Sequence, residues 1–558
     1  MDRGDEDVER LVSSLGVHPV TARILVNRGI RGVEEARVFL NPKLQFLPHP
    51  SLLPDIDEAC RRIAKAILSG EKIAVFGDFD TDGITATALL VRFFRGLGVE
   101  VMHYIPNRLS EGYGLNCDAI SRLAREGVNL IITVDNGVSA RDEIDFASSL
   151  GVDVVISDHH EVAGELPRAC AVVDPKRDAN SPLSELAGVG VAFYLAAALK
   201  SWLEGMGYNK AKGIDLKRFL DLVTVGTVAD VSPLLGANRI LVSHGIRLMK
   251  GSPSPWVEAI MKTAGISGEE MDTDVIAFRI APRINASGRL GRHGVGLDIL
   301  LADDLDRAIY LSSDLEEMNR ERQLLEKRVV DDVEAMLEKD GAIKCIVASS
   351  CEWHPGVIGS AASRLSEKYL VPTVIISIDG EVGRGSVRGV GGFDVIESLH
   401  SLKGFLLDYG GHKGAAGFDI RADLVESFKS ALERYIEEHF VGGVDTSPFV
   451  VDAEIEIGDI STKLISELQA LSPYGEGNPP PCLLVGPCTA KCVKRVGNNH
   501  LKVTLLENGI SIDAIGFGLG SLNIAEGRRY RFAGVPEANV WNNTSRLQIK
   551  FLDVVEVV

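Results

Sequence analysis

Residues 73 to 85 read Ile-Ala-Val-Phe-Gly-Asp-Phe-Asp-Thr-Asp-Gly-Ile-Thr, and this stretch decides the fold around it. The apolar run Ile73–Phe76 predicts a buried strand, and carboxylates follow at alternating positions, at Asp78, Asp80 and Asp82. Alternate residues of an extended chain point to one side, so these like charges repel unless a cation lies between them. Carboxylate oxygens suit Mg²⁺ or Mn²⁺. The pattern predicts a metal site at the carboxyl edge of a parallel strand, with a solvated acidic turn as the alternative.

Composition limits the class of protein. The chain has 558 residues, which corresponds to roughly three to four domains. Its net charge of −19 argues against coating nucleic acid through bulk charge, although an enzyme with a local basic groove remains compatible. Apolar runs stay below the roughly 18 residues of a membrane-spanning helix, and the acidic N-terminus is unlike a secretion signal. We therefore expect a cytoplasmic protein without a membrane segment, whose scattered cysteines are free thiols.

The distribution of helical and strand patterns divides the chain. Residues 1–50 predict a small helical preface, and 51–301 begin with alternating strands and helices that predict a parallel sheet, followed by a mainly helical stretch. A first helix after the acidic loop is expected from Thr85. The remaining segments are a charged connecting helix over 302–340, a second, smaller α/β unit over 341–440 and a β domain over 447–558. The predicted fold class is α/β with a C-terminal barrel.

Further polar side chains stand where other predicted elements end. They are Asp135 after strand 130–134, Asp158, His159 and His160 after strand 153–157, Asp174 after strand 171–173, and Asp230 beside a predicted helix. Taken singly, such an Asp is more often a helix N-cap, and a His pair is more often packed or exposed than metal-binding. Together they form an Asp/His set without thiolates, which suits two adjacent Mn²⁺ or Mg²⁺ ions better than zinc. Two such ions, about 3.5–4 Å apart, are a standard device for displacement at phosphorus.

Other hydrolytic mechanisms lack their sequence signatures. The chain contains no Gly-x-Ser-x-Gly nucleophile elbow. The loop 77–83 lacks the Gly-Lys-Ser/Thr ending of a phosphate-binding P-loop. Nucleotide hydrolysis of the P-loop type is therefore not expected.

At this point a resemblance covers nearly the whole chain. Asp158-His159-His160, together with the acidic loop 78–83, resembles the DHH phosphoesterase superfamily. Seven more segments are similar, in order and spacing, to the RecJ family of single-strand-specific 5′→3′ DNA exonucleases: Asn107–Gly114, Leu186–Gly190, Gly226–Asp230, Ala281–Leu290, Trp353–Gly359, Gly383–Arg388 and Gly410–Gly417. The resemblance implies a DHH domain, a DHHA1 domain over 341–440 and an OB-like barrel over 447–558.

The resemblance also implies roles for the residues at the predicted strand ends. It makes metal ligands of Asp80, Asp82, Asp135, His159 and Asp230. Asp78 would lie within or just behind this ligand shell, and Asp158 would orient a ligand from behind it. His160 would contact the scissile phosphate or assist the leaving group. Catalysis would depend on Asp135 and His160.

A second group of residues would hold the DNA. In the Gly383–Arg388 loop, Ser386 and Arg388 would grip the 5′-terminal phosphate or one nearby, helped by Arg108 and by His412 of the Gly410–Gly414 loop. Taken alone, both loops could equally be plain β-turns. Gly389 replaces a family hydroxyl, so no contact is expected there. Four further residues are candidates to hold or stack on the strand: Arg283, Asn285 and Arg289 of a Pro-Arg-Ile-Asn loop, and Tyr113, which could equally be structural.

The expected function is a Mn²⁺- or Mg²⁺-dependent exonuclease, with two ions, that degrades single-stranded DNA from the 5′ end to nucleoside 5′-monophosphates in repair and recombination. A helicase and a single-strand-binding protein are the partners that the resemblance implies, and a monomer is expected. One alternative is a DHH phosphodiesterase for short oligoribonucleotides or cyclic dinucleotides, although those relatives lack the C-terminal β domain. Another is a catalytically inactive DNA-binding scaffold, although such relatives lose metal carboxylates that are present here.

Overall fold

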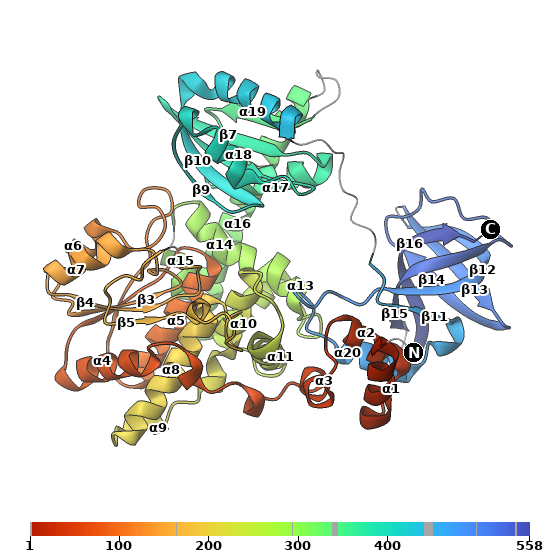
Figure 1. The fold of residues 1–558 in the computed structure, drawn as a ribbon, viewed down its shortest axis with the longest axis horizontal. Coiled ribbons are helices and arrows are strands. Elements are labelled where there is room, and N and C mark those ends of the chain that lie inside the picture. The colour runs from red at the N-terminus through yellow and green to blue at the C-terminus, as the bar shows by residue number, and fades with distance from the viewer. Residues whose placement is uncertain are drawn as a thin grey trace.

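The fold, taken from a computed structural model, has three lobes (Figure 1). The structure describes residues 3–162, 164–292, 294–337, 344–439, 450–497, 499–541 and 544–557. A parallel-sheet lobe is joined by the long helix α16 (Leu305–Leu337) to a smaller α/β lobe, and a β-barrel lies to one side. The predicted fold class is confirmed. The predicted borders near 340 and between 440 and 447 fall in 338–343 and 440–449, outside the described residues.

The first lobe is built on a five-stranded parallel sheet with the strand order β2-β1-β3-β4-β5. Its strands are β1 (Ile73–Phe76), β2 (Met102–Tyr104), β3 (Leu130–Val134), β4 (Asp153–Ser157) and β5 (Ala171–Val173). Alternate residues of β1 enter different cores: Val75 packs with α5 and α8, whereas Phe76 packs with α6 and α7. The chain leaves β1 for β2 on one side and returns to β3 on the other. Sheets of this kind bind ligands at such a reversal, beyond the carboxyl ends of the strands.

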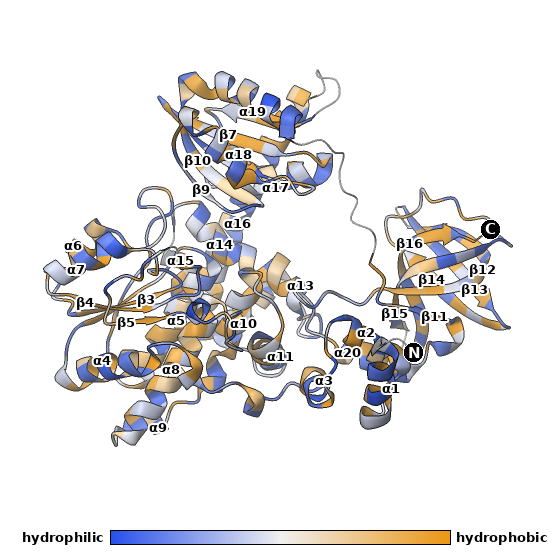
Figure 2. Ribbon diagram, in the orientation of Figure 1, coloured by the Kyte–Doolittle hydropathy of each residue, from blue (hydrophilic) through white to orange (hydrophobic). Residues whose placement is uncertain are grey.

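Five helices accompany this sheet. They are α4 (Ile56–Ser69), α5 (Thr81–Gly96), α6 (Cys117–Arg125), α7 (Arg141–Ser149) and α8 (Gly188–Gly205). Figure 2 shows that α8 and the central strands are largely hydrophobic, as expected for elements covered on several sides. The predicted start of α5 at Thr85 is wrong: the helix begins at Thr81, because Asp80 caps it by accepting a hydrogen bond from Gly83 N at 3.1 Å. Asp82 therefore lies in the first helical turn.

A mainly helical segment completes the first lobe, as predicted. It contains α9 (Asn209–Lys212), α10 (Leu220–Ala229), α11 (Gly236–Gly251), α12 (Pro255–Ala264), α13 (Thr273–Val275), a π-helical turn over Ile276–Ile280, α14 (Ala281–Arg289) and α15 (Gly294–Leu300). The Pro-Arg-Ile-Asn segment is therefore part of a helix, and its predicted loop is wrong. Pro282 occupies the first turn of α14, where a missing N–H costs nothing.

The second lobe contains a mixed sheet with the strand order β6-β7-β8-β10-β9. Its elements are β6 (Ile346–Ser350), α17 (Ile358–Tyr369), β7 (Thr373–Asp379), β8 (Val382–Arg388), α18 (Val395–Ser401), β9 (Leu406–Gly411), β10 (Ala415–Arg421) and α19 (Val425–His439). The predicted loop at Gly383–Arg388 is wrong, because these residues form β8 and pair with both β7 and β10. Their backbone N–H groups serve the sheet, so any ligand contact must come from side chains.

The third lobe combines both ends of the chain. Its strands are β11 (Ala453–Ile455), β12 (Leu483–Val496), β13 (His500–Glu507), β14 (Ile510–Gly516), β15 (Arg529–Trp541) and β16 (Thr544–Glu556), and α20 (Thr462–Ala470) lies between β11 and β12. Pairing of β12 with β15 closes the barrel, as predicted. The N-terminal helices α1 (Arg3–Leu15), α2 (Pro19–Asn27) and α3 (Val33–Leu40) share one apolar core with this barrel. This packing was not predicted from the sequence.

A buried arginine ties the first lobe to the third. Arg239 of α11 is only 2% exposed and stacks over the ring of Phe39 at 3.7 Å. Its guanidinium donates hydrogen bonds of 2.9–3.3 Å to four backbone carbonyls, those of Phe39, Ala470, Ser472 and Pro473. All eight cysteines are free, as predicted. Within the described ranges, no helix is long and apolar enough to cross a membrane.

Candidate metal centre and arginine pocket

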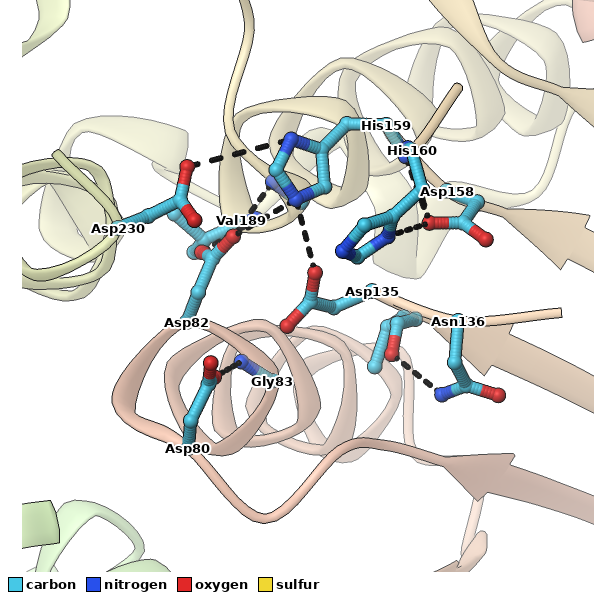
Figure 3. A network of polar contacts seen from close by, with 12 residues as sticks. Asp80, Asp82, Gly83, Asp135, Asn136, Asp158, His159, His160, Val189 and Asp230 are labelled. Atoms are coloured by element: carbon cyan, nitrogen blue, oxygen red, sulfur yellow. Dashed lines mark hydrogen bonds and ion pairs between the residues drawn. The ribbon is translucent and has the colours of Figure 1, made fainter. Parts of the chain in front are cut away.

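The carboxyl ends of β1, β3 and β4 and the end of α10 meet around His159 (Figure 3). Nε2 of His159 lies 3.0 Å from Asp135 Oδ1 and 3.7 Å from Asp82 Oδ2, and its Nδ1 lies 4.0 Å from Asp230 Oδ2. Three strand ends and one helix end thus deliver the predicted side chains to one place. We call Asp78, Asp80, Asp82, Asp135, His159 and Asp230 the metal centre.

The donor atoms form three overlapping groups that could each hold a metal ion. The groups are Asp135 with His159 and His160, Asp82 with His159 and Asp230, and Asp78 with Asp80 and Asp135, with the donor atoms of each group within 4.8 Å of one another. Oδ1 of Asp78 is buried without a hydrogen-bond partner, and Nε2 of His159 is buried and makes no hydrogen bond, although it lies 3.0 Å from Asp135 Oδ1. Buried polar atoms normally have partners, so these atoms fit a cation better than a closed protein interior. Oxygen and imidazole donors without sulfur suit Mn²⁺ or Mg²⁺.

The pKa values also indicate that a cation belongs here. Burial, followed by repulsion from neighbouring carboxylates, raises the pKa of Asp78, Asp82 and Asp135 well above the ordinary aspartate value. Burial lowers the pKa of His159, which leaves its imidazole neutral and able to bind a metal. Ionised carboxylates at this density need a positive charge between them.

Backbone groups of α8 hold one of these carboxylates in place. Asp82 accepts hydrogen bonds from Gly188 N at 2.7 Å and Val189 N at 2.9 Å, at the positive end of the helix. A Cβ on Gly188 would lie 2.7 Å from the Cβ of Asp135, and one on Gly226 would lie 2.8 Å from Asp82 Oδ1. Gly188 and Gly226 belong to the segments Leu186–Gly190 and Gly226–Asp230. Because these glycines have no side chain, α8 and α10 can pack closely against the carboxylates of the metal centre. The role of the amides of Gly188 and Val189 was not predicted from the sequence.

His160 stands beside the metal centre and is oriented from behind. Its Nδ1 lies 2.7 Å from Asp158 Oδ1, which also accepts the backbone N–H of His159 at 2.8 Å. Burial by itself lowers the pKa of His160, but the hydrogen bond and charge of Asp158 raise that pKa to about 9. The hydroxyl of Tyr113 lies 3.2 Å from His160 Nδ1 and donates to the carbonyl of Asp135 at 3.0 Å. His160 can therefore carry a proton toward a bound substrate, with Asp158 as its orienting partner.

A second, positively charged pocket of about 440 Å³ lies between the first and second lobes. Its walls include Arg108, Arg289, Arg384, Ser386 and Arg388, which we call the arginine pocket. Burial lowers the pKa of Arg289 to about 10 and also lowers that of Arg388, and the nearby charge of Arg108 adds to both shifts. Like charges gathered in this way favour an anion with several oxygens.

Hydroxyl groups align the arginine pocket. Arg388 donates to Ser363 Oγ at 2.9 Å and to Ser386 Oγ at 3.0 Å. A Cβ on Gly359 would lie 3.1 Å from Arg388 Nη2, so this glycine leaves room for the guanidinium. Ser386 and Arg388 were predicted from the sequence, whereas Ser363 was not. Arg384 belongs to the predicted phosphate-binding segment but was assigned no role of its own, and it lies two residues before Ser386 on the same face of β8.

Three predicted DNA contacts have other surroundings. The ring of His412 lies in the turn after β9, where its Nδ1 accepts a hydrogen bond from Gly414 N at 3.2 Å, and it is not among the residues lining the arginine pocket. Arg283 forms an ion pair with Glu316 of α16 at 2.7 Å. Asn285 lines a different, apolar pocket beside the metal centre. Arg108, Tyr113, Arg289, Ser386 and Arg388 all line the arginine pocket.

Comparison with known families defines the class. The model described as the DHH family, N-terminal domain, matches residues 72–227, the DHHA1 domain matches 342–438 and the RecJ OB domain matches 451–553. The fold and the Asp/His centre thus define a protein of the DHH class with DHHA1 and OB domains.

Individual relatives show to which family within the DHH class the chain belongs. The single-stranded-DNA-specific exonuclease RecJ of Bacillus subtilis is 35% identical, covering 99% of this chain and 70% of that protein. The protein of that name from Escherichia coli is 33% identical, covering 90% of this chain and 89% of that protein. The crystal structure of Thermus thermophilus RecJ with Mn²⁺ superposes with a TM-score of 0.84 at 31% identity, covering 99% of this chain and 78% of that one. The chain belongs to the RecJ family.

Proposed function

We propose that this chain is a Mn²⁺- or Mg²⁺-dependent exonuclease that degrades single-stranded DNA from its 5′ end and releases nucleoside 5′-monophosphates. The names of its relatives support single-stranded DNA as the substrate, and RecJ structures with Mn²⁺ and with Mg²⁺ support the metals. Repair and recombination are the processes in which such a single-strand exonuclease would act.

The observation that carries this proposal is the contact between the two charged sites. Phe79 and Tyr113 border the arginine pocket. Arg108 lies over the ring of Phe79 at 4.9 Å, Phe79 packs edge-on against Tyr113, and the Tyr113 hydroxyl contacts His160. A terminal phosphate held by the arginines would therefore place the adjoining phosphodiester at the metal centre. An anion site so close to the hydrolytic site supports cutting at a fixed distance from a phosphorylated end.

Three groups of residues would have separate roles in the reaction: metal binding, proton donation and binding of the 5′-phosphate. Asp80, Asp82, Asp135, His159 and Asp230 would hold two ions, with Asp78 as a close support. Ions bound in such a site lower the pKa of a water and offset charge on the phosphoryl oxygens. His160, oriented by Asp158, would donate a hydrogen bond to the scissile phosphate or a proton to the departing oxygen. Ser386, Arg388, Arg289 and Arg108 would hold the 5′-phosphate.

The test compares matched strands. A 5′-phosphorylated single strand labelled at its 3′ end should shorten gradually in Mn²⁺, whereas the same strand in a blunt duplex should persist. The same oligonucleotide labelled at its 5′-phosphate should release labelled mononucleotide at once. Release from the 3′ end first, or equal degradation of the duplex, would contradict the proposal.

We propose further that the protein acts as a cytoplasmic monomer on 5′ ends that a helicase exposes and a single-strand-binding protein covers. The resemblance to the RecJ family supports this context. Light scattering on the purified chain tests the monomer, and a mass corresponding to a dimer would contradict it. Coupled degradation of a duplex after adding a 5′-end-unwinding helicase tests the delivery of substrate.

A further inference from the structure

Asn136 directly follows Asp135, and its side chain lies beside the metal centre without belonging to it (Figure 3). This side chain is completely buried. Its Nδ2 donates hydrogen bonds to the carbonyl of Val134 at 2.9 Å and to the carbonyl of Phe76 at 3.3 Å. Val134 is the last residue of β3 and Phe76 is the last residue of β1. The amide of Asn136 therefore joins two neighbouring strands of the sheet at their carboxyl ends.

The two strands part at this point. Pairing of β1 with β3 extends as far as Phe76, which lies opposite Thr133. Beyond this pair, the backbone N–H of Asp135 donates to Ser157 of β4, whereas that of Gly77 donates to the carbonyl at the end of β2. Each chain thus turns to its other neighbour, which is the reversal at which sheets of this topology bind ligands. A side-chain amide continues the connection between the two strands where their backbones separate.

The charges of the metal centre act against this connection. Asp78 and Asp80 follow β1, Asp135 follows β3, and donor atoms of these three residues lie within 4.8 Å of one another. Like charges at such distances repel each other strongly when they are shielded from water. In the absence of a cation, this repulsion acts to move the two strand ends apart. The hydrogen bonds of Asn136 to both strand ends oppose that movement.

Asp135 itself has an unusual backbone conformation. Its φ is 62°, in the left-handed region that residues other than glycine seldom adopt. Such conformations persist where the surrounding structure holds them in place. The hydroxyl of Tyr113 donates to the Asp135 carbonyl at 3.0 Å, and the following residue, Asn136, is bonded back to Val134. In this conformation the Asp135 carboxylate lies 3.0 Å from His159 Nε2.

We propose that Asn136 is a positioning residue that keeps the ends of β1 and β3 at the spacing the metal ions need, before the ions bind. The inference rests on the metal centre of the proposed function, and it can be tested by metal binding without DNA. Oδ1 of Asn136 is buried and has no hydrogen-bond partner among the residues that the structure describes. The residue therefore acts through the N–H groups of its amide.

Titration calorimetry of Mn²⁺ into the metal-free protein tests the proposal. Asn136→Ala should raise the Kd for Mn²⁺ about tenfold, in the range for losing a residue that orients metal ligands. Asn136→Ser, which keeps one donor, should give a Kd between those of Asn136→Ala and the wild type. On single-stranded DNA, the kcat of Asn136→Ala should fall at limiting Mn²⁺ and return to within about twofold of the wild type at saturating Mn²⁺. Its KM for DNA should not change.

The matched control is Asn129→Ala. Asn129 joins the same two strands at their opposite ends, where its Oδ1 accepts a hydrogen bond from Lys72 N at 3.0 Å. The five residues of β3 place it about 17 Å from Asn136. The Kd of this variant for Mn²⁺ should equal that of the wild type. Thermal denaturation in a chelator shows which variants are folded, and Asn136→Ser provides the test if Asn136→Ala does not fold.

The outcomes separate this inference from the proposed function. An unchanged Kd for Mn²⁺ in a folded Asn136 variant, or an equal rise in Asn129→Ala, overturns the positioning role and leaves the exonuclease standing. A wild-type protein that binds Mn²⁺ but does not degrade single-stranded DNA overturns the exonuclease and leaves the positioning role standing. A wild-type protein that does not bind Mn²⁺ overturns both.

Discussion

The metal centre and the arginine pocket are neighbours with opposite charge, and they are built differently. The metal centre gathers buried carboxylates at the ends of parallel strands, where a sheet of this topology places its ligands. The arginine pocket lies on an antiparallel strand, β8, and borrows Arg108 and Arg289 from the first lobe. The carboxylates of the metal centre are suited to binding cations, whereas the guanidinium groups of the arginine pocket are suited to binding an anion. The comparison suggests that the first determines the chemistry and the second determines which end of the strand is presented.

The largest expected effect comes from removing a proposed metal ligand. Asp135→Ala should lower kcat by about a thousandfold or more, corresponding to about 4 kcal/mol of activation free energy. Binding of a 5′-phosphorylated strand, measured by fluorescence anisotropy, should persist because the arginine pocket is intact. The matched control is Asp145→Asn, at an exposed position of α7, which should behave as wild type. Near-normal kcat in Asp135→Ala would remove Asp135 from the metal centre.

The next effect lies in the other region. Arg388→Ala should raise KM about a hundredfold for 5′-phosphorylated strands, because truncating a partially buried charged group costs about 3 kcal/mol. The preference for a 5′-phosphate over a 5′-hydroxyl should disappear, while kcat at saturation stays near the wild-type value. Arg364→Ala, an exposed arginine on neighbouring α17, is the control. If Arg388→Ala lowered kcat as strongly as it weakened the preference for a 5′-phosphate, the roles of the two regions could not be separated.

Metal should stabilise the fold, and more so at higher pH. The folded, metal-free protein keeps protons on Asp78, Asp82 and Asp135 to a higher pH than the unfolded chain does, because burial and neighbouring carboxylates raise the pKa of these groups. Their contribution is greatest below the ordinary aspartate pKa of about 3.9 and is lost as the pH rises through the raised values. Mn²⁺ at a hundredfold its Kd should add about 2.7 kcal/mol. Thermal denaturation with Mn²⁺ or a chelator should show a larger increment in Tm at pH 8 than at pH 5.

The rise in Tm caused by Mn²⁺ can be checked with a variant of the metal centre. In Asp135→Asn the increment should shrink at both pH values, because one shared ligand has lost its charge. A metal increment independent of pH and of Asp135 would mean that the cation binds elsewhere.

The smallest effects are expected from substituting one glycine beside the metal centre, Gly188, and one beside the arginine pocket, Gly359. Gly188→Ala places a methyl group 2.7 Å from the Cβ of Asp135, so kcat should fall about tenfold as the ligands shift. A Cβ at Gly359 would lie 3.1 Å from the flexible end of Arg388 and 3.3 Å from Ser386 Oγ, so in Gly359→Ala KM should rise about threefold. The kinetic constants of both variants, measured at saturating Mn²⁺, check this contrast. A fall in kcat for Gly359→Ala would contradict the division of roles.

Sequence reasoning succeeded where the signal was local. The apolar run before Asp78 and the strand before Asp135 both form strands of the parallel sheet, and the charged connecting segment predicted over 302–340 forms the helix α16, Leu305–Leu337. The prediction from sequence was wrong where a segment rich in glycine and polar residues is compatible with either a loop or a strand. Gly383–Arg388 has the composition of a loop, yet it forms the strand β8, because its glycines pack against the ring of Phe418 and the side chain of Ile376.

The sequence by itself determined which carboxylates and imidazoles stand at the ends of strands, because these residues can be recognised from their neighbours along the chain. Tertiary structure decided what holds and surrounds them. The amides of Gly188 and Val189 reach Asp82 across 106 and 107 residues, and Arg239 reaches Ser472 across 233. Such contacts depend on how closely distant helices pack. The hydrophobic pattern along the chain does not specify that distance, so only the folded chain brings Asp230 to His159 and Arg289 to the arginine pocket.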